Sequence, residues 1–201
     1  MTSPQSNPGY GEVLNFWFGG EDATFYPQRR PRLWWDATPQ DDELIRREFA
    51  GLLEKAKADE FEGWKRSPRG VLALIILLDQ VSRHAFRGRP SMYNYDASAQ
   101  ALSVGAIEQG IDKHLFLDER AFLYMPLVHA ECLRLQEQAL ALFGDVAGEA
   151  PPSQSDYFAR WLRMAEEHRR TIARFGRFPH RNQILGRGST QEEIDFLLGH
   201  G

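Results

Sequence analysis

The sequence predicts an all-α protein of about seven antiparallel helices, and three observations lead to this prediction. Apolar residues recur with helical spacing along the 201 residues, and no useful stretch alternates with the period of two that strands require. Capping residues and Gly or Pro breaks divide the chain at intervals that suit helices. The hydrophobic content of 42% is enough for one domain with a sizeable core.

The start of the chain is polar. Residues 1–9 are rich in Ser, Pro and Asn and lack the basic and then apolar pattern of a signal peptide, so we expect a flexible tail. A single helical domain is expected over residues 10–201. Its first helix spans residues 12–18, because Gly19 and Gly20 end it.

The second helix is expected to begin at a capped proline. Thr38 can cap it, and Pro39 takes the first position, where the missing N–H would be unpaired in any case. The helix runs to about residue 58, and the connection over residues 21–38 is expected to be irregular and aromatic. The inward face of the helix carries Leu44, Ile45, Phe49, Leu52 and Leu53.

The third helix is expected to be the centre of the fold. Ser67 and Pro68 open it, and it spans residues 69–86. Residues 71–78 are apolar on every side, which is typical of a helix buried all round. A membrane span needs about 20 apolar residues, so this run is too short and we expect no membrane association.

Two further helices are expected after the central one. Asp96 can cap the first, which ends at Gly110, and the second is long, over residues 118–143. Pro126 lies inside the long helix, where it removes one backbone hydrogen bond and should cause a kink. Residues 144–153 combine Gly, Pro and acids, and we expect them to form a mobile linker.

The last part of the chain is expected to contain one long and one short helix. The long helix spans residues 156–175 and a glycine ends it. Residues 177–188 are expected to form a loop or a single turn. Thr190 and Glu193 can form a capping box for a short final helix that ends near residue 198.

Several polar residues fall on apolar helix faces. Asp79 and Arg83 are four residues apart, and they form either an internal ion pair that fixes helix register or a pocket wall where Arg83 binds an anion. His129 and His168 each lie within an apolar stripe. Each is either a core histidine that donates to a carbonyl group or, for His129, a general base working near neutral pH.

A basic corner follows the long helix over residues 156–175. Residues 160–187 contain eight Arg and only two acids. Arg177, His180 and Arg181 come directly after the helix, and guanidinium groups there could bind a carboxylate or phosphate. The alternative is a solvated basic face without a ligand.

Composition excludes several classes of function. The net charge of −4 disfavours nucleic-acid binding, which usually needs a basic excess. Cys132 is the only cysteine, so no intrachain disulfide can form and a cytoplasmic, reducing location is expected. The histidine spacing matches no metal motif, and no nucleotide, metalloprotease or nucleophile-elbow motif is present, so we expect neither metal nor cofactor. The sequence carries no signal for an oligomeric state.

Four segments resemble a bacterial family of uncharacterised proteins, number 924 among the domains of unknown function. They are Val13-Leu-Asn-Phe-Trp-Phe-Gly19, Leu74-Ile-Ile-Leu-Leu-Asp-Gln-Val-Ser-Arg83 with Phe86-Arg-Gly88, Glu119-Arg-Ala-Phe-Leu-Tyr-Met-Pro-Leu127, and Arg174-Phe-Gly-Arg-Phe-Pro-His-Arg-Asn182 with Ile184-Leu-Gly186. The resemblance implies a tetratricopeptide-like helical fold and brings no established activity. The family reads His-Ser-Glu where this chain has His129-Ala-Glu131.

Two functions from different classes fit these observations, and the sequence leaves enzyme status open. The first is a pocket for a small anionic molecule, with His129 and Asp79 as catalytic residues. The residues expected to bind the substrate are Arg83, Arg177, His180, Arg181, Asn182, Trp17, Trp35 and Tyr124, and His129, Arg83, Arg177 and His180 should line one cavity. The second is a tetratricopeptide-like module that binds a peptide or protein without catalysis.

Overall fold

The computed structural model describes residues 9–19 and 30–199, and within these ranges the regular elements are all helices. The predicted all-α class is confirmed. The expected tail over residues 1–9 lies, apart from its last residue, outside the described residues. The α-helices are α1 (Tyr10–Phe18), α2 (Pro31–Trp35), α3 (Pro39–Lys57), α4 (Pro68–Ile75), α5 (Ser82–Ala85), α6 (Asp96–Glu108), α7 (Leu117–Val128), α8 (Leu133–Glu149), α9 (Ser155–Phe175) and α10 (Gln191–Leu197).

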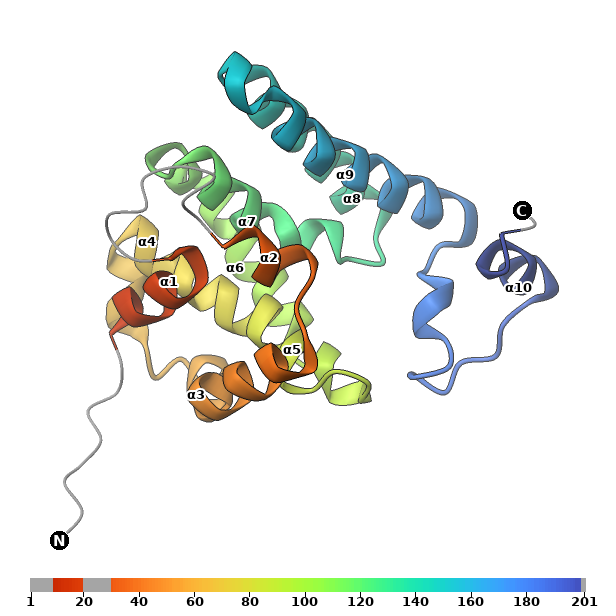
Figure 1. Ribbon diagram of the computed structural model, residues 1–201, viewed down its shortest axis with the longest axis horizontal. Helices are drawn as coiled ribbons and strands as arrows, with labels where there is room; N and C mark the ends of the chain where they lie inside the picture. Colours follow the sequence, from red (N-terminus) through yellow and green to blue (C-terminus); the bar gives the residue numbers. More distant parts are fainter. Residues whose placement is uncertain (1–8, 20–29, 200–201) are drawn as a thin grey trace, which may run out of the picture.

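The helices from α1 to α7 form a bundle, and α8 and α9 pack along each other and extend to one side of it (Figure 1). Beyond the end of α9, the chain passes through a short 3₁₀ turn, Pro179–Arg181, and reaches α10 far from the N-terminal helices (Figure 1). None of the helices in the described part of the chain is long and apolar enough to cross a membrane.

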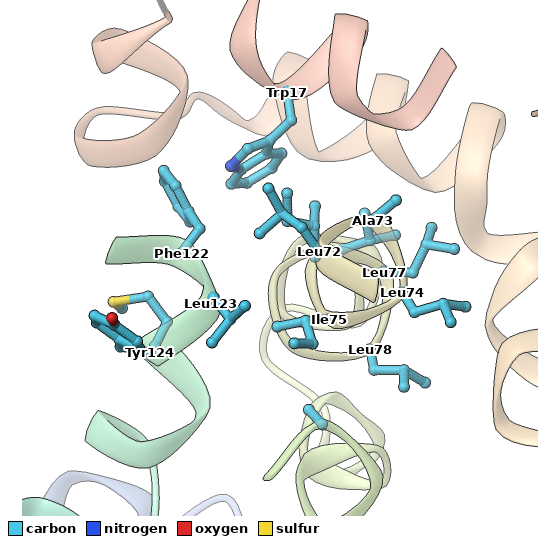
Figure 2. Packing of buried hydrophobic residues seen from close by; sticks show 14 of the residues in the cluster. Trp17, Leu72, Ala73, Leu74, Ile75, Leu77, Leu78, Phe122, Leu123 and Tyr124 are labelled. Carbon is cyan, nitrogen blue, oxygen red and sulfur yellow. The ribbon is translucent and has the colours of Figure 1, made fainter. Parts of the chain in front are cut away.

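The predicted central helix is the axis of the bundle. It is made of α4, a wider π-helical segment, Ile76–Val81, and α5, which follow one another without a break. Residues 71–78 are all buried, as the sequence predicted. Figure 2 shows their side chains pointing outward in several directions, while Trp17 and Phe122 face them from neighbouring helices.

The π-helical segment was not predicted from apolar spacing. Its wider turn leaves backbone carbonyls without their usual partners, and side chains from the next turn bind two of them. Ser82 Oγ donates to the carbonyl of Leu78 at 2.7 Å, and Arg83 Nη1 donates to the carbonyl of Asp79 at 3.0 Å. Segments of this kind occur frequently at functional sites, which draws attention to Asp79.

The caps predicted at Thr38, Ser67 and Thr190 are confirmed. Thr38 and Thr190 each form a capping box, and the Ser67 side chain accepts from the third residue of the next helix. Gly19 and Gly176 end their helices with φ values of 97° and 68°. Residues with a Cβ atom rarely adopt this left-handed conformation, which explains the glycines.

The predicted long helix over residues 118–143 is wrong, because the chain leaves the helix at residues 129–132 and begins α8 at Leu133. Pro126 remains inside α7, and the helix ends two residues after it, at Val128. Gln136 accounts for the break, since its Nε2 donates to the carbonyls of Val128 at 2.6 Å and Ala130 at 2.7 Å. A side chain thus binds carbonyls at the C-terminal end of α7.

The predicted mobile linker over residues 144–153 is also wrong. Residues 144–149 complete α8, and a short turn leads to α9. Two glycines in this helix disfavour it by about 1 kcal/mol each relative to Ala. Phe143 and Val146 are fully buried in the same stretch, so packing outweighs that preference.

Two smaller expectations differ from the structure. Tyr95, and not Asp96, is the N-cap of α6, because the Asp96 carboxylate binds Arg83 instead. Part of the connection expected over residues 21–38 is helical, as α2 shows, and residues 20–29 lie outside the described residues.

An aromatic cluster joins the first helices to α7 and α9. The ring centroids of Trp34 and Phe122 are 4.8 Å apart, those of Phe122 and Trp161 5.2 Å, and those of Trp35 and Trp161 4.7 Å. Edge-to-face pairs of this kind add to the stability that burial provides. Trp17 packs on Phe122 as well, so the cluster closes the interior of the bundle.

Phe122 stands at the centre of this cluster, which gives a test of the fold. Replacing it by Ala removes a buried ring and leaves a cavity, so Phe122→Ala should lower the free energy of unfolding by about 3–5 kcal/mol. Leu198→Ala, at a side chain that is 65% exposed, is the control and should change it little. Equal losses for the two variants in urea denaturation would contradict the described packing.

Candidate functional site

A hydrogen-bonded pair of Asp79 and His129 lies where α7 ends against the central helix. Asp79 belongs to the π-helical segment and is 1% exposed, and His129 is the C-cap residue of α7. His129 Nδ1 lies 2.8 Å and 2.9 Å from the two carboxylate oxygens of Asp79. The contact joins residues 50 positions apart, and the break after α7 is what places the imidazole there.

The charges around this pair fix its protonation. Burial alone would raise the pKa of Asp79, but the guanidinium of Arg83 and the contact with His129 bring it down to about 2. Burial, with the nearby charges of Arg83 and Arg181, lowers the pKa of the His129 imidazole to about 4, although the contact with Asp79 acts in the opposite direction. At neutral pH, Asp79 is therefore ionised and His129 is neutral.

The tautomer of His129 follows from these charges. An ionised carboxylate can only accept, so Nδ1 carries the proton and donates it to Asp79. Nε2 then holds a lone pair, and no described residue forms a hydrogen bond with it. The His129 side chain is 13% exposed. Nε2 is therefore the atom through which this pair could accept a proton from an incoming molecule.

Arg83 extends the site toward α6. Its guanidinium binds the Asp96 carboxylate at two points, over 2.8 Å and 3.1 Å, and lies 3.5 Å from the Asp79 carboxylate. Asp79 is buried as predicted, whereas the Arg83 side chain is 14% exposed and Asp96 is its closer partner. The sequence predicted Asp96 as a helix cap and did not predict that it binds Arg83.

Arg181 reaches the same place from the C-terminal segment. Its Nη2 donates to the carbonyl of His129 at 2.9 Å, and its guanidinium carbon lies 4.8 Å from the ring centre of Tyr93 and 4.4 Å from that of Phe178. Nη1 is 3.8 Å from Asp96. Arg181 is 7% exposed, and its Nε has no hydrogen-bond partner among the described residues.

Arg177 and Asn182, by contrast, belong to a network that holds the C-terminal segment together. Arg177 binds Glu193 at two points, over 2.6 Å and 2.8 Å, and Asn182 Nδ2 donates to Glu193 at 3.2 Å. Arg187 binds Glu131 at two points, which ties the same segment to the start of α8. The sequence indicated Glu193 only as part of a capping box, and neither Glu193 nor Glu131 was predicted to pair with these arginines.

The predicted single cavity is wrong. His180 lines a cleft of about 620 Å³ beside α9, together with His168, but His129, Arg83 and Arg177 do not line it. His168 donates from Nδ1 to the carbonyl of Met164 at 2.9 Å, as expected for a core histidine. The structure thus separates the predicted site residues into the Asp79–His129 pair with its arginines, the C-terminal network and the cleft.

The aromatic walls expected for that cavity lie elsewhere. Trp17 and Tyr124 are 0% exposed, and Tyr124 donates to Asp112 at 2.6 Å inside the bundle. Trp35 is half-buried and carries the guanidinium of Arg160 on its ring at 4.1 Å. Among the described residues, no group of three or more His, Cys, Asp or Glu could hold a metal ion.

Comparison with known proteins gives a family and no activity. Residues 13–201 match the model of a family described as bacterial protein of unknown function, DUF924. A solved structure of a protein of unknown function from Agrobacterium tumefaciens is 34% identical and has a TM-score of 0.79, with 94% of this chain and 96% of that chain covered. No curated protein matches the chain.

The protonation of His129 can be tested directly. Its imidazole should stay neutral, with the proton on Nδ1, as the pH falls from 8 to 5, and should titrate near pH 4, against about 6.5 in the unfolded chain. Because the folded pKa is depressed, the contribution of His129 to stability is complete above about pH 6.5 and declines as the pH falls toward 4. Long-range ¹H–¹⁵N NMR would report this, and titration at or above 6.5 would contradict the geometry.

The burial of Asp79 gives a second test. Asp79→Ala leaves the buried Nδ1–H of His129 without an acceptor and Arg83 with Asp96 as its remaining carboxylate, so the free energy of unfolding should fall by about 1–3 kcal/mol. Glu48→Ala, in an exposed pair with Arg47, is the control and should cost less than about 1 kcal/mol. Chemical denaturation measures both, and a small loss for Asp79→Ala would refute the described contact.

Proposed function

The chain belongs to the DUF924 family of bacterial proteins of unknown function, so membership supplies no activity, and we propose from the site that the protein is an enzyme acting on a small anionic molecule with His129 as general base. The observation that carries this proposal is the neutral imidazole, held through Nδ1 by Asp79 while Nε2 is left without a hydrogen bond.

The carboxylate of Asp79 has a defined part in this proposal. It fixes the tautomer and orientation of the imidazole, and it stabilises the imidazolium that forms when Nε2 takes a proton. Asp79 therefore acts through His129 and is a positioning residue. Its own ionisation is secured because Arg83 and His129 hold its pKa at about 2.

An imidazole whose pKa is about 4 is a weak base, and a bound anionic substrate would make it a stronger one. The positive fields of Arg83 and Arg181 are among the causes of the low pKa. An anion bound against these guanidinium groups would offset their charge and raise the pKa of His129, so the base would become stronger once substrate is present.

The arginines support an anion as the ligand. Arg83 and Arg181 both lie near the Asp96 carboxylate, at 2.8 Å and 3.8 Å, and the buried Nε of Arg181 lacks a partner among the described residues. Guanidinium groups bind carboxylates and phosphates well because their N–H groups match the spacing of the oxygens. We therefore propose that the substrate carries a carboxylate or a phosphate. The single free cysteine among the described residues supports a cytoplasmic location for the protein.

The second candidate is a tetratricopeptide-like module that binds a peptide without catalysis. The α8–α9 pair, which extends from the bundle, favours it, since paired helices of this kind present surfaces to partners (Figure 1). In that case the contact between Asp79 and His129 would only hold α7 against the central helix.

An activity screen distinguishes the two. The purified protein is incubated in D₂O with a panel of carboxylated and phosphorylated metabolites, and NMR follows both product formation and deuterium uptake at carbon. His129→Gln can keep a hydrogen bond to Asp79 but lacks the base, so the rate should fall by about 100-fold or more. A panel in which nothing is converted, or a variant as fast as wild type, would contradict the proposal and favour the binding module.

A second Asp–His contact in the chain supplies the matched control. His84 Nδ1 lies 2.7 Å from Asp42 Oδ1, and the ring is buried against Trp17. His84→Gln makes the same substitution in a similar contact outside the proposed site, so the variant should keep its activity. Equal losses for His84→Gln and His129→Gln would show that the effect is structural.

A further inference from the structure

A cleft of about 620 Å³ is lined by residues from the C-terminal half of α9 and from the segment that follows it as far as α10. Its size suits a small molecule. The residues that line it are Glu167, His168, Arg170, Thr171, Arg174, Phe178, His180 and Phe196, so it shares none of the residues of the Asp79–His129 pair. Whatever it binds is separate from the chemistry proposed for His129.

Aromatic rings form the walls of this cleft. The ring of Phe178 lies 5.3 Å from that of His168 and 5.4 Å from that of His180. Phe196 stands on the α10 side, 5.0 Å from Phe175. Burial lowers the pKa of both histidines, so at neutral pH they are uncharged rings that can stack with a flat ligand.

Two arginines on α9 supply positive charge at the same cleft. Arg170 Nη2 lies 3.2 Å from Glu166, and Arg174 Nε lies 2.9 Å from Glu192. Both pairs are exposed to solvent, and exposed pairs contribute little to stability. An anion in the cleft could therefore take the place of either glutamate without a large loss elsewhere.

We propose that this cleft binds a small planar aromatic anion, an aromatic ring that carries a carboxylate, sulfonate or phosphate. The ring stacks among His168, Phe178 and Phe196, and the anionic group is bound by Arg170 and Arg174. The aromatic walls favour a flat apolar body, and the guanidinium groups favour oxygens in a plane. A neutral aromatic molecule would gain only the first of these contacts.

A fluorescence titration tests the proposal with 8-anilinonaphthalene-1-sulfonate and its uncharged analogue N-phenyl-1-naphthylamine. The double variant Arg170→Gln/Arg174→Gln should bind the sulfonate about tenfold more weakly and the neutral analogue as wild type does. Arg134→Gln/Arg163→Gln removes the same charge from exposed positions on α8 and α9 and should change neither affinity. Circular dichroism checks that each variant is folded.

The position of the probe is tested by the imidazole signals in ¹H–¹⁵N NMR. The signals of His168 and His180 should shift on addition of the sulfonate, and that of His129 should not. The proposal is overturned if the two double variants bind the sulfonate equally, if the signals of His168 and His180 stay unchanged, or if binding is absent below about 1 mM.

Discussion

The buried carboxylate of Asp79 is the constraint on which the rest of the structure depends. An ionised group inside an apolar helix bundle is stable only when positive charge and hydrogen bonds surround it. Arg83 and His129 provide them, and to do so α7 must end at His129. The shape of the bundle around the central helix is therefore coupled to the protonation of one residue.

The same constraint extends to the C-terminal segment. Arg181 binds the backbone carbonyl of His129 and lies near the carboxylate that Arg83 holds, so the turn after α9 is fixed against the end of α7. The ring of Phe178 lies against Arg181 on one side and contacts His168 and His180, which line the cleft. Arg181 and Phe178 thus lie between the Asp79–His129 pair and the cleft beside α9, the two places proposed to bind a ligand.

The elements that depend on local chemistry could be predicted from the sequence, and those that depend on distant contacts could not. The capping box at Thr38 and the apolar run at residues 71–78 carry their own signal, and both are confirmed. The break after α7 depends on Gln136, which binds carbonyls from the preceding helix. The inward placement of Asp79 and His129 followed from helical spacing, but their contact required the break and the wider turn, which spacing does not show.

The central claim is that His129 is a base whose strength depends on an anion bound near Arg83 and Arg181. The most direct test is an NMR titration of the His129 imidazole with and without inorganic phosphate. Without phosphate the pKa should be about 4, and with saturating phosphate it should rise, because the anion offsets the two guanidinium charges. The same pKa in both titrations would contradict the account.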